Sequence, residues 1–188
     1  MATLQNHKIL VTGGDGRFAK VLKQKNKKLN LIFANKNQCN ILKTNSIETI
    51  VKKIKPKTII HCAGLSRPMD EHEKNINKSI NLNIIGTANI TKVCQKYKIK
   101  LIYFSTNYVY EGTKGNYSET DSIKPFNNYG LSKMGGECSV LMYENSLILR
   151  ITMCERPFLH ESAFYDINTN FIFHDEVVKF IPKILNKK

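Results

Sequence analysis

A tyrosine and a lysine four positions apart are the first residues here whose types and spacing could carry chemistry. They are Tyr129 and Lys133, in the stretch NNYGLSKMGGE, residues 127–137. In a helix this spacing places both side chains on one face, one turn apart. A phenol titrates near pKa ~10, and a neighbouring ammonium lowers that value, which suits proton transfer at neutral pH. The spacing also occurs by chance on ordinary helix surfaces, so the pair alone decides nothing.

A glycine-rich turn near the N-terminus is the second stretch of interest. VTGGDGRFA, residues 11–19, follows an apolar run and opens a helical pattern, the context that a dinucleotide-binding turn requires. Gly13 would allow a sharp turn, Gly16 would let the backbone approach a pyrophosphate, and Ala19 would pack close to a sheet. Amides at the start of the helix would bind the anion. An ordinary glycine-rich turn is the alternative.

The end of the second apolar run bears on which dinucleotide would bind. An acidic residue there favours NAD, because it bonds the ribose 2′-hydroxyl. Residues 33–38 read FANKNQ and contain no acid. Lys36, and also Arg17, could face a 2′-phosphate instead, although both could equally be surface residues. We therefore predict NADP, with NAD as the other possibility.

Short apolar runs alternate with helical patterns along the chain. Nearly continuous apolar strands are typical of a parallel sheet covered on both faces, and the alternation predicts a doubly wound α/β fold. Ligands of such folds bind beyond the carboxyl ends of the strands, where both stretches above would lie. Asn45 is expected to cap one helix and Pro56 to stop it. The expected strands are residues 7–14, 29–35, 58–64, 100–106 and 146–152, and the expected helices are 16–24, 45–55, 70–97 and the one around Tyr129.

The net charge of +14 raises the question of nucleic-acid binding. Lysine supplies nearly all of this charge, and the lysines are scattered among asparagines and isoleucines, which is typical of an AT-rich genome. A nucleic-acid-binding protein is expected to cluster its basic residues and to use more arginine. We therefore predict no nucleic-acid partner; strongly salt-dependent retention on DNA would indicate otherwise.

Other classes of site and location are not favoured either. The 188 residues and 41% hydrophobic content suit one soluble domain. No stretch approaches the ~18 apolar residues of a membrane span, and the N-terminus lacks the pattern of a signal peptide, so a cytoplasmic protein is expected. The five cysteines form no C-x-x-C motif and the five histidines lack metal-ligand spacing. We predict reduced thiols and no metal site.

Taken together, these stretches resemble the extended short-chain dehydrogenase/reductase family, and most of all its dTDP-4-dehydrorhamnose reductase group. The likeness runs from about residue 7 to residue 152. It rests on TGGDGRFA, PKTIIHCAG, NLNIIGTAN, FSTNYVYEG, ETDSIKPFNNYGLSKMGGE and LILRIT. The resemblance implies a Rossmann-like sheet and an NADP-dependent reductase or epimerase of a 4-keto-6-deoxy sugar nucleotide.

The resemblance also implies roles for individual residues. Tyr129 would be the catalytic acid and Lys133 its partner, and both would contact the cofactor, Lys133 at the nicotinamide ribose. The other residues it implies are Thr106 and Asn83 in catalysis, Gly13, Gly16, Arg17, Phe18, Lys36, Ala63, Gly64 and Ser105 around the cofactor, and Ser66, Arg67 and Asn107 around the substrate.

The C-terminal part departs from the family pattern. We expect residues 1–152 to form the cofactor-binding domain with the catalytic residues. Residues 153–188 would be a reduced substrate segment packed on it. Within this segment, 155–170 would replace a longer insertion, and 171–185 resembles the late helix that packs back onto the sheet in longer members. A non-catalytic nucleotide-binding subunit is therefore the alternative, and the regulatory beta subunit of methionine adenosyltransferase is a family precedent. An intact set of Thr106, Tyr129 and Lys133 favours the enzyme. A homodimer or a partner subunit is suggested by resemblance alone.

Overall fold

A five-stranded parallel sheet forms the centre of the molecule. The computed structural model describes residues 7–26, 28–158 and 169–187. The sheet has the strand order β2-β1-β3-β4-β5, and every neighbouring pair is parallel. This is the 2-1-3-4-5 order of doubly wound folds, in which the order of strands reverses between β1 and β3. The strands are β1 (Ile9–Thr12), β2 (Leu31–Ala34), β3 (Thr58–His61), β4 (Lys100–Ser105) and β5 (Ser146–Arg150).

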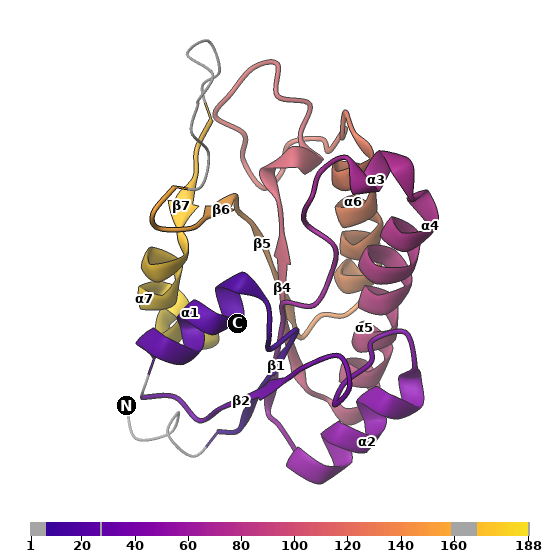
Figure 1. The fold of residues 1–188 in the computed structure, drawn as a ribbon, viewed down its shortest axis with the longest axis vertical. Helices are drawn as coiled ribbons and strands as arrows, with labels where there is room; N and C mark the ends of the chain where they lie inside the picture. Colours follow the sequence, from indigo (N-terminus) through magenta and orange to yellow (C-terminus); the bar gives the residue numbers. More distant parts are fainter. Residues whose placement is uncertain (1–6, 27, 159–168, 188) are drawn as a thin grey trace.

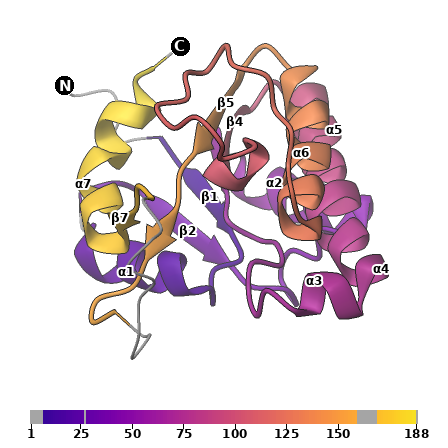
Figure 2. The same ribbon diagram turned by 90° about the horizontal axis from the view of Figure 1, so that it is seen from above.

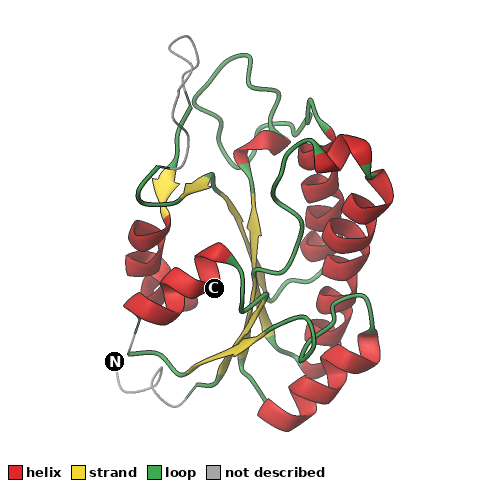
Figure 3. Cartoon of the chain, viewed as in Figure 1, coloured by secondary structure: helices red, strands yellow, loops and turns green. Residues whose placement is uncertain are grey.

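Helices cover both faces of this sheet, as the alternating pattern predicts. Figure 1 shows α1 and α7 on one side and the remaining long helices on the other, and Figure 2 shows the same separation from above. Figure 3 shows the yellow strands between two red helical layers. The long helices are α1 (Arg17–Lys25), α2 (Thr44–Ile54), α5 (Gly86–Tyr97), α6 (Asn128–Leu141) and α7 (His174–Leu185). The predicted Rossmann-like α/β class is confirmed.

Successive residues of a strand pack in two separate hydrophobic cores, one on each face of the sheet. In β1, Leu10 packs with α2 and α5, whereas Ile9 and Val11 pack with α1 and α7. This follows from the two-residue period of a strand, which sends successive side chains to opposite faces. All three residues are fully buried. The near-continuous apolar strands are therefore explained by burial on both sides.

The segment expected to be one helix over residues 70–97 is interrupted. It consists of α3 (Glu71–Lys74), α4 (Ile76–Ser79), a π-helical stretch η1 (Ile80–Ile85) and then α5. Asn75 leaves helical geometry with φ −138° and ψ 73°, and its side chain accepts a hydrogen bond from the Lys78 amide. A short amide side chain that bonds nearby backbone competes with the helix, which explains the break.

Several predicted boundaries shift by a few residues. The proposed cap at Asn45 is wrong, because α2 already begins at Thr44 and the amides of Ser46 and Ile47 bond the Lys43 carbonyl. Asn45 thus lies inside the helix. The stop before Pro56 is confirmed, since α2 ends at Ile54. Each strand is shorter than its expected range, at its carboxyl end in every case and at its start in β1 and β2.

The C-terminal part joins the same core. β6 (Met153–Cys154) and β7 (Ile172–Phe173) form a small parallel pair, so α7 begins at residue 174 instead of 171. α7 packs beside α1 (Figure 1) and buries Ile181 in the core that α1 shares. Most of the segment 155–170 lies outside the described residues. No helix among the described residues is both long and apolar enough to cross a membrane.

Candidate active site

The glycine turn and the loop after β3 meet at the point where the strand order reverses. Gly13 has φ +68°, a conformation that favours glycine, and its carbonyl accepts a hydrogen bond of 2.8 Å from the Gly16 amide. A Cβ atom on Gly13 would lie 2.8 Å from the Ala63 backbone. The two strand ends can therefore approach this closely only because Gly13 has no side chain.

A cavity of about 270 Å³ opens between these two turns. Five of the residues predicted to contact the cofactor line it together: Gly13, Gly16, Lys36, Ala63 and Gly64. The other residues that line the cavity were not predicted from the sequence: Asp15, Asn35, Cys39, Asn40, Ile41, Cys62 and Leu82. The Lys36 side chain is exposed at its edge. A larger hollow of about 730 Å³, lined by Lys57 and Lys100, lies at the opposite ends of the strands and contains none of the predicted site residues.

Tyr129 and Thr106 lie side by side beyond the end of β4. Burial raises the pKa of the Tyr129 phenol, while the neighbouring Thr106 hydroxyl and the charges of Arg67 and Arg17 act against that rise. The net direction is opposite to the lowering expected from the Tyr–Lys spacing, because removal from water outweighs nearby positive charge. The Tyr129 ring packs on the rings of His72 and Tyr108, at 5.0 and 5.9 Å between centroids.

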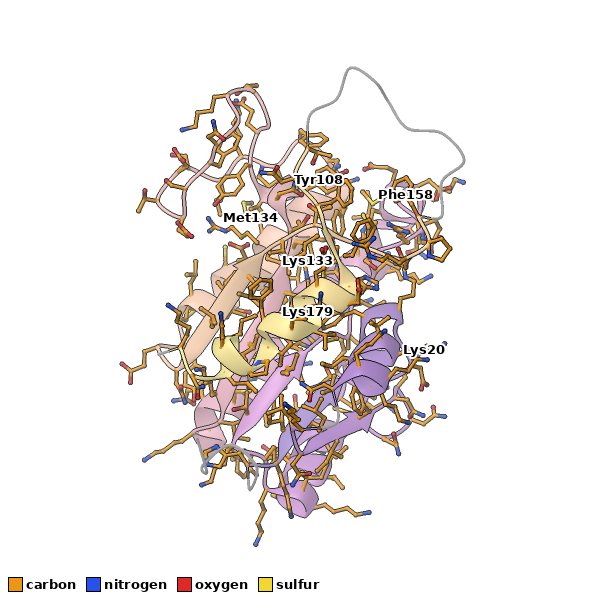
Figure 4. All side chains as sticks on the ribbon, turned by 90° about the vertical axis from the view of Figure 1, so that its left-hand side faces the viewer. Lys20, Tyr108, Lys133, Met134, Phe158 and Lys179 are labelled. Carbon is orange, nitrogen blue, oxygen red and sulfur yellow. The ribbon has the colours of Figure 1, made fainter. Side chains whose placement is uncertain are left out.

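Lys133 lies one turn along α6 from Tyr129 and over an aromatic face. Its Nζ is 4.1 Å from the centroid of the Tyr103 ring, a distance typical of a cation–π contact. Burial lowers the pKa of Lys133 to about 7, and the charge of Glu137 opposes this effect. Close packing is allowed by Gly136, where a Cβ atom would lie 2.5 Å from the Tyr103 hydroxyl. Figure 4 shows Lys133 and Tyr108 in the upper half of the view, where the loops after the strands gather.

Asn83, predicted to be catalytic, has its side chain fully engaged with protein groups. Its Oδ1 accepts from the Leu65 amide at 2.7 Å, and its Nδ2 donates to the Leu65 carbonyl and to Ser132 Oγ, each at 2.8 Å. The residue is buried inside η1. It therefore joins three elements, namely η1, the loop after β3 and α6, and it holds the loop at the edge of the cavity.

Arg17, Ser66 and Arg67 gather around one carboxylate. Arg17 pairs with Glu155 at 2.9 Å and Arg67 pairs with the other oxygen of Glu155 at 3.3 Å. Arg17 also donates to Ser66 Oγ at 3.2 Å. Predicted cofactor and substrate residues thus meet at one point, held by an acid that sequence reasoning missed because it follows the last predicted strand.

The remaining predicted residues differ in how they face the site. The Phe18 side chain is buried and packs on Phe104, with 5.0 Å between the ring centroids. A cofactor contact by Phe18 would therefore be made by its backbone amide in the first turn of α1. Ser105 is buried, and its hydroxyl has no hydrogen-bond partner within the described part of the chain. Asn107 accepts a hydrogen bond from the Thr152 hydroxyl and donates to Thr169.

Three further neighbours of Tyr129 and Lys133 were not predicted from the sequence. Tyr103 reads as one more core residue of an apolar run, and His72 reads as a polar helix residue. Glu137 is fully buried and ion-paired with Arg150 at 2.9 Å. Its spacing of four from Lys133 is the one hint that a helix-face analysis could have used. Within the described residues, no group of three or more His, Cys, Asp or Glu side chains is placed to hold a metal ion.

Comparisons with known proteins agree with this architecture. The beta subunit of methionine adenosyltransferase 2 from Pongo abelii is 32% identical over 174 residues, which are 85% of this chain and 51% of that protein. A dTDP-4-keto-6-deoxy-D-glucose reductase from Streptomyces niveus is 31% identical over 135 residues, 70% of this chain and 46% of that protein. The chain thus spans about half the length of these relatives.

Solved structures of reductases share the fold. dTDP-4-dehydrorhamnose reductase from Bacillus anthracis, solved in complex with NADP, superposes with a TM-score of 0.84 at 23% identity, covering 96% of this chain and 71% of that one. The Yersinia enterocolitica enzyme gives 0.69 at 27% identity, covering 95% and 61%. The family model described as the RmlD substrate binding domain matches residues 7–154. The chain therefore belongs to this family, whose members include the dTDP-4-dehydrorhamnose reductases.

Proposed function

We propose that this chain binds NADP and carries the catalytic residues of a reductase acting on a 4-keto-6-deoxy sugar nucleotide. The observation that carries the proposal is the meeting of Thr106, Tyr129 and Lys133 at the same edge of the sheet as the glycine-lined cavity. A pure binding protein needs the cavity but does not need a buried phenol beside a hydroxyl and an amine.

The residues around the cavity fit a dinucleotide with a 2′-phosphate. Gly16 caps α1 without a side-chain bond, and the first turn of α1 contains no acid, so its amides and the positive end of its dipole are left for an anion. Lys36 lines the same cavity, and the stretch after β2 contains no carboxylate. These features favour NADP over NAD.

The protein side of the reduction follows from the protonation states. NADPH, when bound, would supply hydride to the carbonyl carbon of the substrate. The raised pKa of Tyr129 keeps the phenol protonated at neutral pH, ready to donate its proton to the carbonyl oxygen. The Thr106 hydroxyl would donate a hydrogen bond to that oxygen and stabilise its developing charge. Asn83 acts by positioning the loop and α6.

The supporting experiment is a fluorescence titration of the purified protein with NADPH and, in parallel, NADH. We expect saturable binding that favours NADPH, followed by oxidation of NADPH when a dTDP-4-keto-6-deoxy sugar is added. Absence of binding by either nucleotide would count against the proposal. Binding without turnover of any 4-keto sugar nucleotide would favour the alternative.

That alternative is a non-catalytic nucleotide-binding subunit. It is favoured by the likeness to methionine adenosyltransferase beta subunits. A subunit of this kind would act in complex with a partner protein, whereas the reductase would act alone or as a homodimer, in the cytoplasm in either case. Unchanged in vitro function of a Tyr129→Phe variant would decide for the subunit.

A further inference from the structure

Two arginines from distant parts of the chain share a single carboxylate beside the cavity. Arg17 is the first residue of α1, and Arg67 lies in the loop after β3. Each forms an ion pair with a different oxygen of Glu155, which follows β6. Arg67 also donates a hydrogen bond to Oε2, whereas Oε1, which faces Arg17, is buried and has no hydrogen-bond partner among the described residues. The Glu155 side chain is only 16% exposed, whereas those of Arg17 and Arg67 are 44% and 32% exposed. The acid is therefore enclosed by the two guanidinium groups.

The surroundings of this carboxylate favour an anion that carries more than one negative charge. Two guanidinium groups and the positive end of α1 converge on the place, and the first turn of α1 contributes no acid of its own. His174, at the start of α7, is buried nearby and packs on Phe18 at 5.6 Å between rings. Its Nδ1 has no hydrogen-bond partner among the described residues. One carboxylate thus leaves positive charge unmatched, and a buried ring nitrogen nearby without a hydrogen bond.

We propose that Glu155 occupies a phosphate-binding site formed by Arg17, Arg67 and the start of α1, and that a diphosphate group binds there by displacing it. Guanidinium groups bind phosphate oxygens in the same forked geometry that they use for carboxylates. A diphosphate brings more negative charge and more acceptor oxygens than one carboxylate. The inference rests on the proposed nucleotide binding and adds to it a residue of the protein that competes with the ligand.

The position of the cluster supports a nucleotide diphosphate as the ligand. Gly16, which lines the cavity, directly precedes Arg17, and Gly64 lies two residues before Ser66 in the other wall. Ser66 accepts a hydrogen bond from Arg17, so the two walls are already joined here. The phosphates of a dinucleotide bound in the cavity would therefore lie next to the Arg17–Ser66 hydrogen bond.

The test compares Glu155→Gln with the wild-type chain and with Glu144→Gln. Glu144 is exposed at the opposite edge of the sheet, so its variant makes the same change in net charge far from the cluster. Two probes are used: inorganic pyrophosphate, followed by the shift in melting temperature, and NADPH, followed by fluorescence. For Glu155→Gln we expect binding of both probes to tighten by about three- to tenfold, as expected when a competing ion pair is removed. Glu144→Gln should match the wild type.

The outcomes separate this inference from the proposed function. Unchanged or weaker binding of both probes by Glu155→Gln, or an equal gain in Glu144→Gln, would overturn the inference. Tighter pyrophosphate binding without any NADPH binding would uphold the phosphate site and count against the proposed function. If the protein binds NADPH but Glu155→Gln does not tighten this binding, the result would support the proposed function and overturn the inference about Glu155. If Glu155→Gln does not fold, Glu155→Asp keeps the charge but is too short to bridge both arginines, and it should give a smaller gain in the same direction.

Discussion

The Tyr129 phenol is the group on which the catalytic reading depends. A Tyr129→Phe variant removes the proton but keeps the ring that packs on His72 and Tyr108. We expect kcat for reduction to fall by about 10²–10⁴-fold, the usual contribution of a positioned proton donor, while the Kd of NADPH changes by less than about twofold. Steady-state kinetics and nucleotide titration measure both. Tyr97→Phe, which removes a half-buried phenol that bonds Glu48 on α2, is the control and should retain full activity.

The Tyr103 ring should set the charge of Lys133. Burial places the Lys133 pKa at about 7, so its ammonium form is lost as pH rises through that value. The ring face 4.1 Å away stabilises the ammonium, by about 1 kcal/mol or more at a desolvated site. Tyr103→Leu removes this stabilisation and should lower the Lys133 pKa by about one unit.

Tyr103→Phe is the matched control, because it keeps the ring and loses only the hydroxyl. Its Lys133 pKa should stay near that of the wild type. Side-chain NMR of labelled lysine, with the resonance assigned through Lys133→Arg, measures this titration without any need for turnover. A Leu variant whose Lys133 titrates at or above the wild-type value would contradict the role given to the ring.

At the scale of elements, Asn83 is the joint between η1, the loop after β3 and α6. Asn83→Ala leaves the Leu65 amide and carbonyl and the Ser132 hydroxyl without their bonds in a buried place. We expect the free energy of unfolding to fall by about 2–4 kcal/mol, since unsatisfied buried polar groups cost about 1–3 kcal/mol each and relaxation recovers part. Urea denaturation followed by circular dichroism measures it.

Asn89→Ala is the control for this prediction. Asn89 lies in the same helical segment, in a half-buried position, where it donates one bond to the Ile41 carbonyl and accepts a long one of 3.4 Å from the Thr44 hydroxyl. Its loss should cost about 1 kcal/mol. Equal losses in the two variants would show that Asn83 is an ordinary helix residue and that the loop is held by other contacts.

Most helices and strands could be predicted from local sequence patterns, but the contacts between them could not. Helix α6 and the glycine turn follow from side-chain spacing and from glycine chemistry within a few residues of chain. The π-helical η1, in contrast, contains Asn83, whose side chain bonds Leu65 in a separate segment of the chain. Glu155 pairs with Arg17 across most of the chain, and no local rule predicts such a pair.

At the scale of the whole molecule, the C-terminal segment is part of the core and not an appendage. A division at residue 152 follows from the sequence motifs, the last of which ends there. Yet α7 buries Val177, Ile181 and Leu185 against α1 and the sheet. Gly16, the N-cap of α1, lines the cavity, so the packing of α7 against α1 helps to hold this wall of the cavity in place.

This reading predicts unequal effects at two adjacent positions of α7. Ile181 is fully buried, whereas the neighbouring Phe180 is 48% exposed. Ile181→Ala should lower the free energy of unfolding by about 2–5 kcal/mol, because it removes buried methyl groups and leaves a cavity between α7, α1 and the sheet. Phe180→Ala should change it by about 0.5 kcal/mol or less. Denaturation by urea measures both, and NADPH titration of the folded fraction tests whether α1 has moved. Similar small losses in both variants would mean that residues 7–152 fold without α7, and that the boundary suggested by the family likeness is also a boundary of stability.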